Sequence, residues 1–158
     1  MTTLLRIYLN DHLAGATLGL ELGRRALREN RDNPFGEFLD GLVREIAEDR
    51  ASLERLMDTL GIRRSRVKPA LALAAERAGR LKLNGRVRSY SPLSRLLELE
   101  GLTIGVQGKL AMWRNLKESV ELPPDAPDLA RLIARAERQL EALERQRVEA
   151  TKLALRPG

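Results

Sequence analysis

Apolar residues recur at spacings of three and four along most of the chain, and breakers divide this pattern into four long segments. Spacing of this kind is typical of amphipathic helices. The first segment runs from about Thr3 to Arg31 and ends in the sequence NRDNP. The next three run from Asn33 to Gly61, from Ser91 to about Val120, and from about Pro127 to Leu155. The sequence therefore predicts an all-α protein whose four helices are each about 40 Å long.

Residues 62–90 form a long connection between the second and third helical segments, whereas the other two connections are short. This connection has its own apolar pattern and an Asn84-Gly85 turn signal, which together predict a short fifth helix. Because short loops join antiparallel helices, the second and third helices are expected to run in the same direction. We predict a single bundle domain, residues 1–158, with this connection as a crossover along its length.

Composition removes several classes of site. The chain has no cysteine and a single histidine, His12, so thiolate sites, disulfides and sites with two imidazoles are excluded. No apolar run approaches the roughly 18 to 20 residues of a membrane span. The beginning, MTTLLRIYLN, also lacks the pattern of a signal peptide. A cytoplasmic location without a membrane span is expected.

Positive charge is concentrated in the crossover. Between Ile62 and Arg95 there are ten Lys or Arg residues against one acid, Glu76, in a chain of net charge +6. Candidate anion-binding residues are Arg63, Arg64, Arg66, Arg86 and Arg88. Tyr90 is the one aromatic residue that could stack on a base, and no nucleic-acid motif is present. An acidic protein partner or self-association is therefore favoured over nucleic acid, and a solvated arginine-rich surface is the simpler alternative.

Glycines gather in the middle of two helical segments. The first carries Gly15, Gly19 and Gly23, and the third carries Gly101, Gly105 and Gly108. Each glycine costs about 0.8 to 1 kcal/mol relative to alanine within a helix, so the grouping predicts that these two helices pack unusually closely. The alternative is that the small residues face an oligomer partner. Both helices also have wide apolar arcs, which favours a homodimer.

Charged residues interrupt the apolar arcs of the second and fourth helices. Asp49 and Arg50 fall inside the arc of the second helix, Glu45 lies at its edge, and Arg147 falls inside the arc of the fourth. With two helix pairs, a long crossover and acidic groups at mid-bundle, the chain resembles the ferritin-like superfamily. The resemblance implies a ferritin-like four-helix bundle with an extra short helix in the crossover.

The ligand set of that superfamily is incomplete here. Its metal-carrying members supply a carboxylate from each of two helices and an ExxH motif from each of the other two. The second helix of this chain has no histidine, and the sequence Glu144-x-x-Arg147 places an arginine where the motif has histidine. Arginine stays charged and cannot coordinate a cation. The resemblance thus implies a degenerate di-metal centre.

Two interpretations of the core polar residues remain open. In the favoured one they form an ion-pair network of His12, Glu45, Asp49, Arg50 and Arg147. In the other they form a reduced site for one iron or manganese ion, built from Asp11, His12, Glu45, Asp49 and Glu100. The first predicts a non-catalytic binding, scaffold or interaction protein without cofactor or catalytic residues. The second predicts a metal-dependent oxidoreductase or metal-storage protein.

Overall fold

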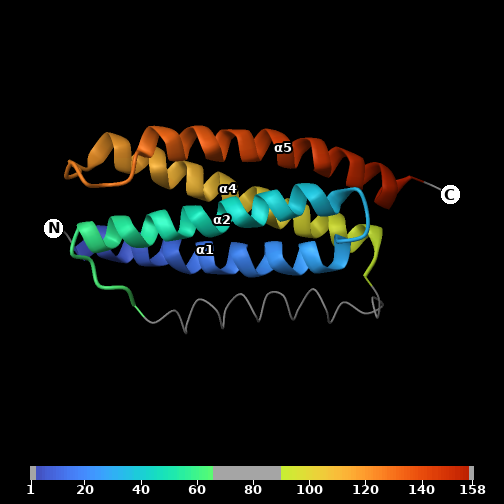
Figure 1. Cartoon of the computed structure of the whole chain (residues 1–158), viewed down its shortest axis with the longest axis horizontal. Coiled ribbons are helices and arrows are strands. Elements are labelled where there is room, and N and C mark those ends of the chain that lie inside the picture. Colours follow the sequence, from blue (N-terminus) through green and yellow to red (C-terminus); the bar gives the residue numbers. More distant parts are fainter. Residues whose placement is uncertain (1–2, 66–89, 157–158) are drawn as a thin grey trace.

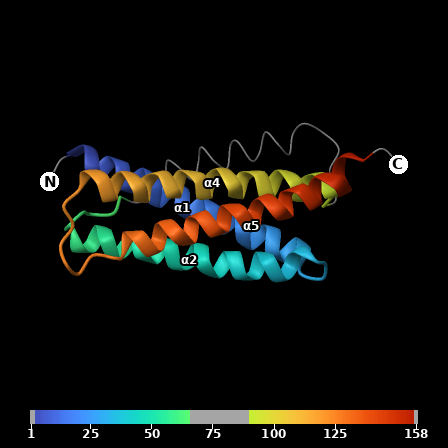
Figure 2. The same ribbon diagram turned by 90° about the horizontal axis from the view of Figure 1, so that it is seen from above.

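The computed structural model describes residues 3–65 and 90–156. They form a bundle of four helices, α1 (Thr3–Asn30), α2 (Phe35–Thr59), α4 (Pro92–Ser119) and α5 (Leu129–Leu155) (Figure 1). α1 and α2 form one antiparallel pair and α4 and α5 the other. α2 ends at one end of the bundle and α4 begins at the other, so these two helices run in the same direction (Figures 1 and 2).

This arrangement confirms the predicted all-α four-helix bundle with a long connection between the second and third helices. The predicted fifth helix falls on residues 66–89 and lies outside the described residues, as do three of the candidate anion-binding residues, Arg66, Arg86 and Arg88.

Local signals set the helix ends close to where the sequence places them. Gly61, directly after α2, has a positive φ of 64°, a conformation that glycine adopts without strain. Ser91 caps α4 through a reciprocal pair of hydrogen bonds with Ser94, and Pro92 takes the first helical position. Asp128 caps α5 by accepting hydrogen bonds from two backbone N–H groups. The last helix therefore begins slightly later than predicted, because the cap follows the prolines.

The hydrophobic core is divided into two clusters along the bundle axis. One cluster lies toward the end of α1 and the beginning of α4 and includes Leu39, Leu99 and Leu143. The other surrounds Trp113 toward the opposite end and includes Leu9 and Leu56. Each of these side chains stabilises the fold by about 1.5 to 3 kcal/mol through its burial. Polar residues occupy the level between the two clusters, at the middle of the bundle.

The predicted close approach of the two glycine-bearing helices is wrong along most of its length. A Cβ atom at Gly23 would lie 3.1 Å from Val43 of α2, and one at Gly101 would lie 2.9 Å from Leu22 of α1. At the other four, Gly15, Gly19, Gly105 and Gly108, a Cβ atom would meet nothing within 4 Å in the part of the chain that the structure describes. These four glycines line a cavity between the helices instead of a tight contact.

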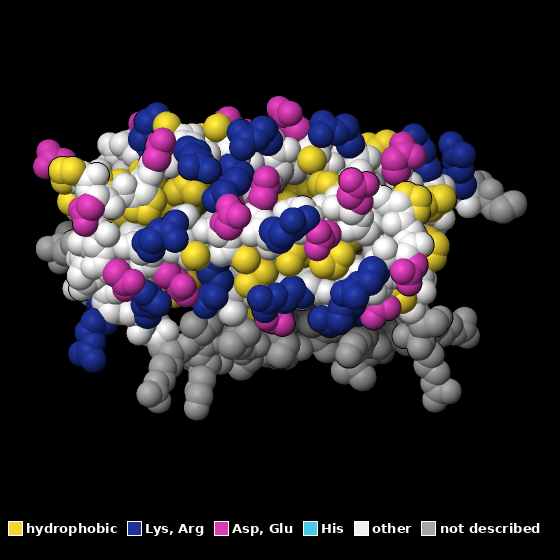
Figure 3. Space-filling model, viewed as in Figure 1, with side chains coloured by type: hydrophobic (Ala, Val, Ile, Leu, Met, Phe, Trp, Pro, Cys, Tyr) yellow, Lys and Arg dark blue, Asp and Glu magenta, His cyan; other side chains and the backbone are white. Residues whose placement is uncertain are grey.

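The surface mixes charges of both signs with scattered apolar side chains. On the face shown in Figure 3, Lys and Arg side chains alternate with Asp and Glu side chains, and apolar side chains show between them. Exposed apolar residues on α1 and α4 include Leu4, Ile7, Leu97 and Ile104. Whether a second copy covers them stays a prediction. None of the helices in residues 3–65 and 90–156 is both long and apolar enough to cross a membrane.

Candidate functional site: a buried ion-pair network and an adjoining cavity

Asp49 is the centre of the mid-bundle polar residues. It lies in α2 among apolar residues that face the core, so its side chain is only 2% exposed. Arg135 of α5 places Nη2 at 2.5 Å from Asp49 Oδ1, and Lys109 of α4 places its ammonium group against Oδ2. Both oxygens of this carboxylate therefore face a cation, and the two cations come from two different helices.

Gln139 of α5 extends the network. Its carbonyl oxygen accepts a hydrogen bond of 2.6 Å from Lys109 Nζ. Its amide nitrogen donates to Asp49 Oδ2 at 3.2 Å and to Glu45 Oε2 at 2.8 Å. Both ends of the amide are therefore used, and the network joins three helices at the level between the two apolar clusters. Asp49 Oδ1 is held by its ion pair with Arg135, whose Nε has no hydrogen-bond partner among the described residues.

The charges of the network are balanced locally. Arg135 contacts Asp49 and also pairs with the exposed Glu48 at 2.6 Å. Burial lowers the pKa of the Lys109 amine, and the nearby Asp49 carboxylate opposes that shift. The carboxylate thus stabilises the charged form of the lysine, which would otherwise be costly so far from water.

Arg147 is not part of this network, contrary to the sequence-based interpretation. Its guanidinium pairs with Glu144 on the same helix at 2.7 Å, and its side chain is 32% exposed. The physical reason is depth along the bundle. α5 runs antiparallel to α4 and reaches the level of Asp49 in its first half, at Arg135 and Gln139, so Arg147 lies about three turns further on.

His12 and Arg50 lie beside the network, and among the described residues neither forms a hydrogen bond or ion pair with Asp49. Arg50 donates to Thr17 Oγ1 at 3.2 Å and pairs with Glu54 at 2.9 Å. The His12 ring packs edge-on against Tyr8 with centroids 4.6 Å apart. Burial lowers the pKa of His12, although Asp11 opposes the shift, so the imidazole is neutral at neutral pH.

The alternative metal-ligand set is not brought together. Asp11 is exposed, Glu45 accepts from Gln139, and Asp49 is paired with two cations. Within residues 3–65 and 90–156, no group of three or more His, Asp or Glu side chains could hold a metal ion. The predicted single-cation site at Asp11, His12, Glu45, Asp49 and Glu100 therefore has no counterpart in the described part of the chain.

In the described part of the basic segment after α2, the guanidinium of Arg64 forms ion pairs and that of Arg63 forms none. Arg64 contacts Asp58 and lies 3.9 Å from Glu54. Arg63 is exposed, and its backbone carbonyl accepts a hydrogen bond from Asn10 at 3.2 Å. These contacts secure the chain after α2 against α1, and they add no observation in favour of an anion site.

A second polar cluster lies at the end of the bundle where α4 begins. The hydroxyl of Tyr90 donates to Glu98 Oε2 at 2.8 Å and accepts from Asn30 Nδ2 at 2.6 Å. Arg25 lies 3.0 Å from the other oxygen of Glu98, and Arg95 donates to Asn30 at 2.5 Å. Burial raises the pKa of Glu98, and hydrogen bonding to Tyr90 and the charge of Arg25 lower it by less. This cluster fixes the chain at the start of α4.

Replacing Glu98 with glutamine is expected to change how stability depends on pH. Since its folded-state pKa is raised, the contribution of Glu98 to stability is complete below its unfolded pKa and is lost as pH rises through the folded value. Glutamine can still accept from Tyr90 without carrying a charge. Urea unfolding from about pH 4 to pH 8 should therefore show wild type losing stability relative to Glu98→Gln as the pH rises. Glu118→Gln, an exposed change on the same helix, should show no such trend.

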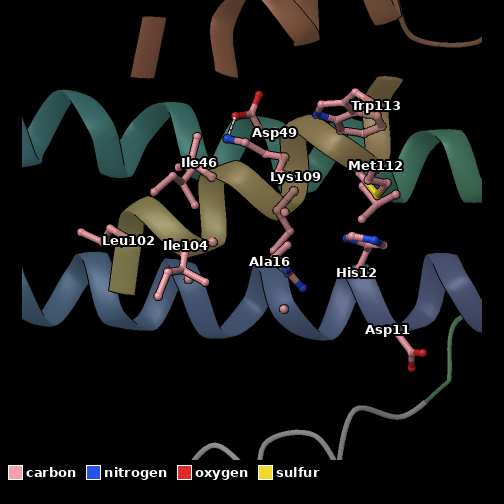
Figure 4. Close-up of a pocket in the computed structure, with 17 residues that line it drawn as sticks. Asp11, His12, Ala16, Ile46, Asp49, Leu102, Ile104, Lys109, Met112 and Trp113 are labelled. Atoms are coloured by element: carbon pink, nitrogen blue, oxygen red, sulfur yellow. Dashed lines mark hydrogen bonds and ion pairs between the residues drawn. The ribbon is translucent and has the colours of Figure 1, made fainter. Parts of the chain in front are cut away.

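A cavity of about 210 Å³ adjoins the network between α1, α2 and α4 (Figure 4). Its apolar walls include Ile46, Leu102, Met112 and Trp113. Asp49 and Lys109, joined by a dashed line in Figure 4, form its polar side. Trp113 is fully buried, and its indole nitrogen has no hydrogen-bond partner among the described residues. The sequence gives no signal for this cavity, because its walls come from three helices that are far apart along the chain.

The chain matches no protein-family model, no curated protein and no solved structure in the three comparisons with known proteins.

Proposed function

We propose that this protein is a non-catalytic ferritin-like bundle that works by binding, and that an ion-pair network takes the place of the superfamily's di-metal centre. The observation that carries the proposal is the pairing of both Asp49 oxygens with cations, Lys109 and Arg135. The long connection between α2 and α4 and the polar level at mid-bundle support the likeness in architecture.

The chemistry of these partners argues against a metal at Asp49. Charged lysine and arginine have no lone pair to give to a metal, and their charges repel a divalent cation. A metal ion would have to displace both cations, which would leave Lys109 buried without an ion-pair partner and Arg135 with only the exposed Glu48, and this is costly. The metal-dependent alternative, an iron or manganese oxidoreductase or storage protein, therefore has less support than the binding function.

The remaining parts of the proposal concern partners and place. The exposed apolar residues of α1 and α4 support a homodimer, and the basic segment after α2 supports an acidic protein partner. A cytoplasmic protein of this kind would act as a scaffold or interaction protein. Nucleic-acid or polyanion binding through the basic crossover has less support, because Tyr90 is the one aromatic residue there that could stack on a base and no nucleic-acid motif is present.

Metal analysis tests the proposal directly. The full-length protein, produced with added iron and manganese and purified without chelator, is expected to contain well under one equivalent of either metal per chain. The Asp49→Ala variant, prepared in parallel, sets the background. One equivalent of iron or manganese in the wild type that disappears in Asp49→Ala would overturn the non-catalytic proposal.

A further inference from the structure

The cavity beside Lys109 contains one buried donor that has no acceptor in the described chain. Trp113 is 0% exposed and belongs to the cavity wall, and its Nε1 makes no hydrogen bond there. In Figure 4 the nitrogen-bearing edge of the indole faces Asp49 and Lys109 across the pocket. Indole can only donate, and an unpaired buried donor is rare in folded proteins. This N–H group therefore points to an acceptor that the described residues do not provide.

Glycines keep the volume in front of this donor open. Gly15 and Gly19 on α1 and Gly105 and Gly108 on α4 all line the cavity. A Cβ atom at any of the four would meet no atom of the described residues within 4 Å, so close packing between the described helices does not require glycine at these positions. Each glycine nevertheless weakens its helix relative to alanine. The small residues and the unpaired donor are independent observations that indicate the same thing, a space for a ligand.

The charges in the wall indicate a neutral ligand. Asp49 is paired with Lys109 and Arg50 with Glu54, so these charges of the wall are already used. Asp11 also lines the cavity, but it is exposed. His12 at the same wall is neutral at neutral pH because its burial favours the uncharged form. A charged ligand would therefore enter a partly buried space without a free buried counter-charge, which is unfavourable.

We propose that this cavity binds a small, neutral, mainly apolar molecule that accepts a hydrogen bond from Trp113 Nε1, such as an aromatic or branched-chain carbonyl compound. An apolar cavity of about 150 Å³ is enough to hold benzene, so a cavity of about 210 Å³ fits one ring with a short substituent. The inference rests on the proposed function, because it requires Asp49 to stay paired with Lys109 instead of holding a metal.

The single tryptophan of the chain makes the proposal directly testable by NMR, because one indole N–H resonance reports on the site. Two probes are compared with the ¹⁵N-labelled full-length protein: acetophenone, and α-methylstyrene, in which a methylene group replaces the carbonyl oxygen. Both are expected to perturb the indole resonance by filling the cavity. Only acetophenone should move the indole proton downfield, since only it can accept the hydrogen bond.

Variants separate binding in the cavity from binding elsewhere. Gly108→Leu fills the cavity and should abolish the response to both probes, whereas Gly41→Leu, also at a helical glycine with open space but outside the cavity, should preserve it. Trp113→Phe should weaken the binding of acetophenone relative to that of α-methylstyrene by about three- to tenfold, as measured by calorimetry. This ratio cancels the difference in hydration between the probes.

The inference is overturned if neither probe affects the indole resonance of the wild type, if Gly108→Leu binds both as well as Gly41→Leu does, or if the probe ratio is the same in Trp113→Phe. The first comparison uses unmodified protein, so it remains decisive if a variant does not fold. A metal-free protein that binds neither probe would refute the ligand site and leave the ion-pair proposal intact. Metal bound at Asp49 would refute the proposed function itself.

Discussion

Replacing Asp49 with alanine is expected to lower the free energy of unfolding by about 3 to 5 kcal/mol. The substitution removes the carboxylate that pairs with both Lys109 and Arg135, and the two cations stay in the core without it. Gln139 would also lose one acceptor. A cost of this size in a domain of 158 residues corresponds to a fall in Tm of about 6 to 20 °C.

Urea unfolding of matched variants measures this effect. Glu48→Ala removes the exposed partner of Arg135 and should cost less than about 1 kcal/mol. Lys109→Met removes one of the two cations, and in the double variant with Asp49→Ala the losses should be clearly less than additive. If Asp49→Ala and Glu48→Ala lowered the free energy of unfolding equally, the buried ion pairs of Asp49 would contribute no more to stability than the exposed ion pair of Glu48.

Two glycine substitutions are expected to have opposite effects on stability. Gly36 lies at the tight turn from α1 into α2, where a Cβ atom would lie 2.7 Å from the backbone carbonyl oxygens of Asn30 and Arg31. Backbone cannot move aside as a flexible side chain can, so Gly36→Ala should destabilise the protein by about 1 to 3 kcal/mol. The new methyl group of Gly105→Ala meets nothing within 4 Å among the described residues, so this change should stabilise α4 by up to about 1 kcal/mol.

Thermal unfolding of the two single variants beside wild type tests this pair. The expected order of Tm is Gly105→Ala above wild type and Gly36→Ala below it. Gly41→Ala provides a second helical glycine with open space and should behave like Gly105→Ala. If Gly105→Ala and Gly36→Ala moved Tm in the same direction, the space around a glycine would not explain the effect of replacing it.

Most helix boundaries could be predicted because their signals are local. Ser91 and Pro92 begin α4, and Gly61 ends α2, through backbone geometry that depends only on neighbouring residues. The apolar period likewise identified the buried face of α2, and with it the unusual position of Asp49. The direction of the four helices followed from the lengths of the connections, since a short loop can only return the chain alongside itself.

Partners across the bundle could not be predicted in the same way. The sequence places Arg147 inside an apolar arc as clearly as it places Asp49, but an arc gives direction around a helix and not depth along the bundle. The sequence pattern did not mark Lys109 as a buried residue, for another reason. It lies among glycines on a helix that is weakly amphipathic, where no clear periodicity marks a buried cation.

The sequence by itself determined four helices, their limits, their order and a buried carboxylate on the second, because these depend on residues close together along the chain. Only the tertiary structure decided that Lys109 and Arg135 hold that carboxylate, and that glycines of α1 and α4 border open space beside Trp113. Such facts depend on the axial shift and separation of helices, which are set by the packing of many side chains at once.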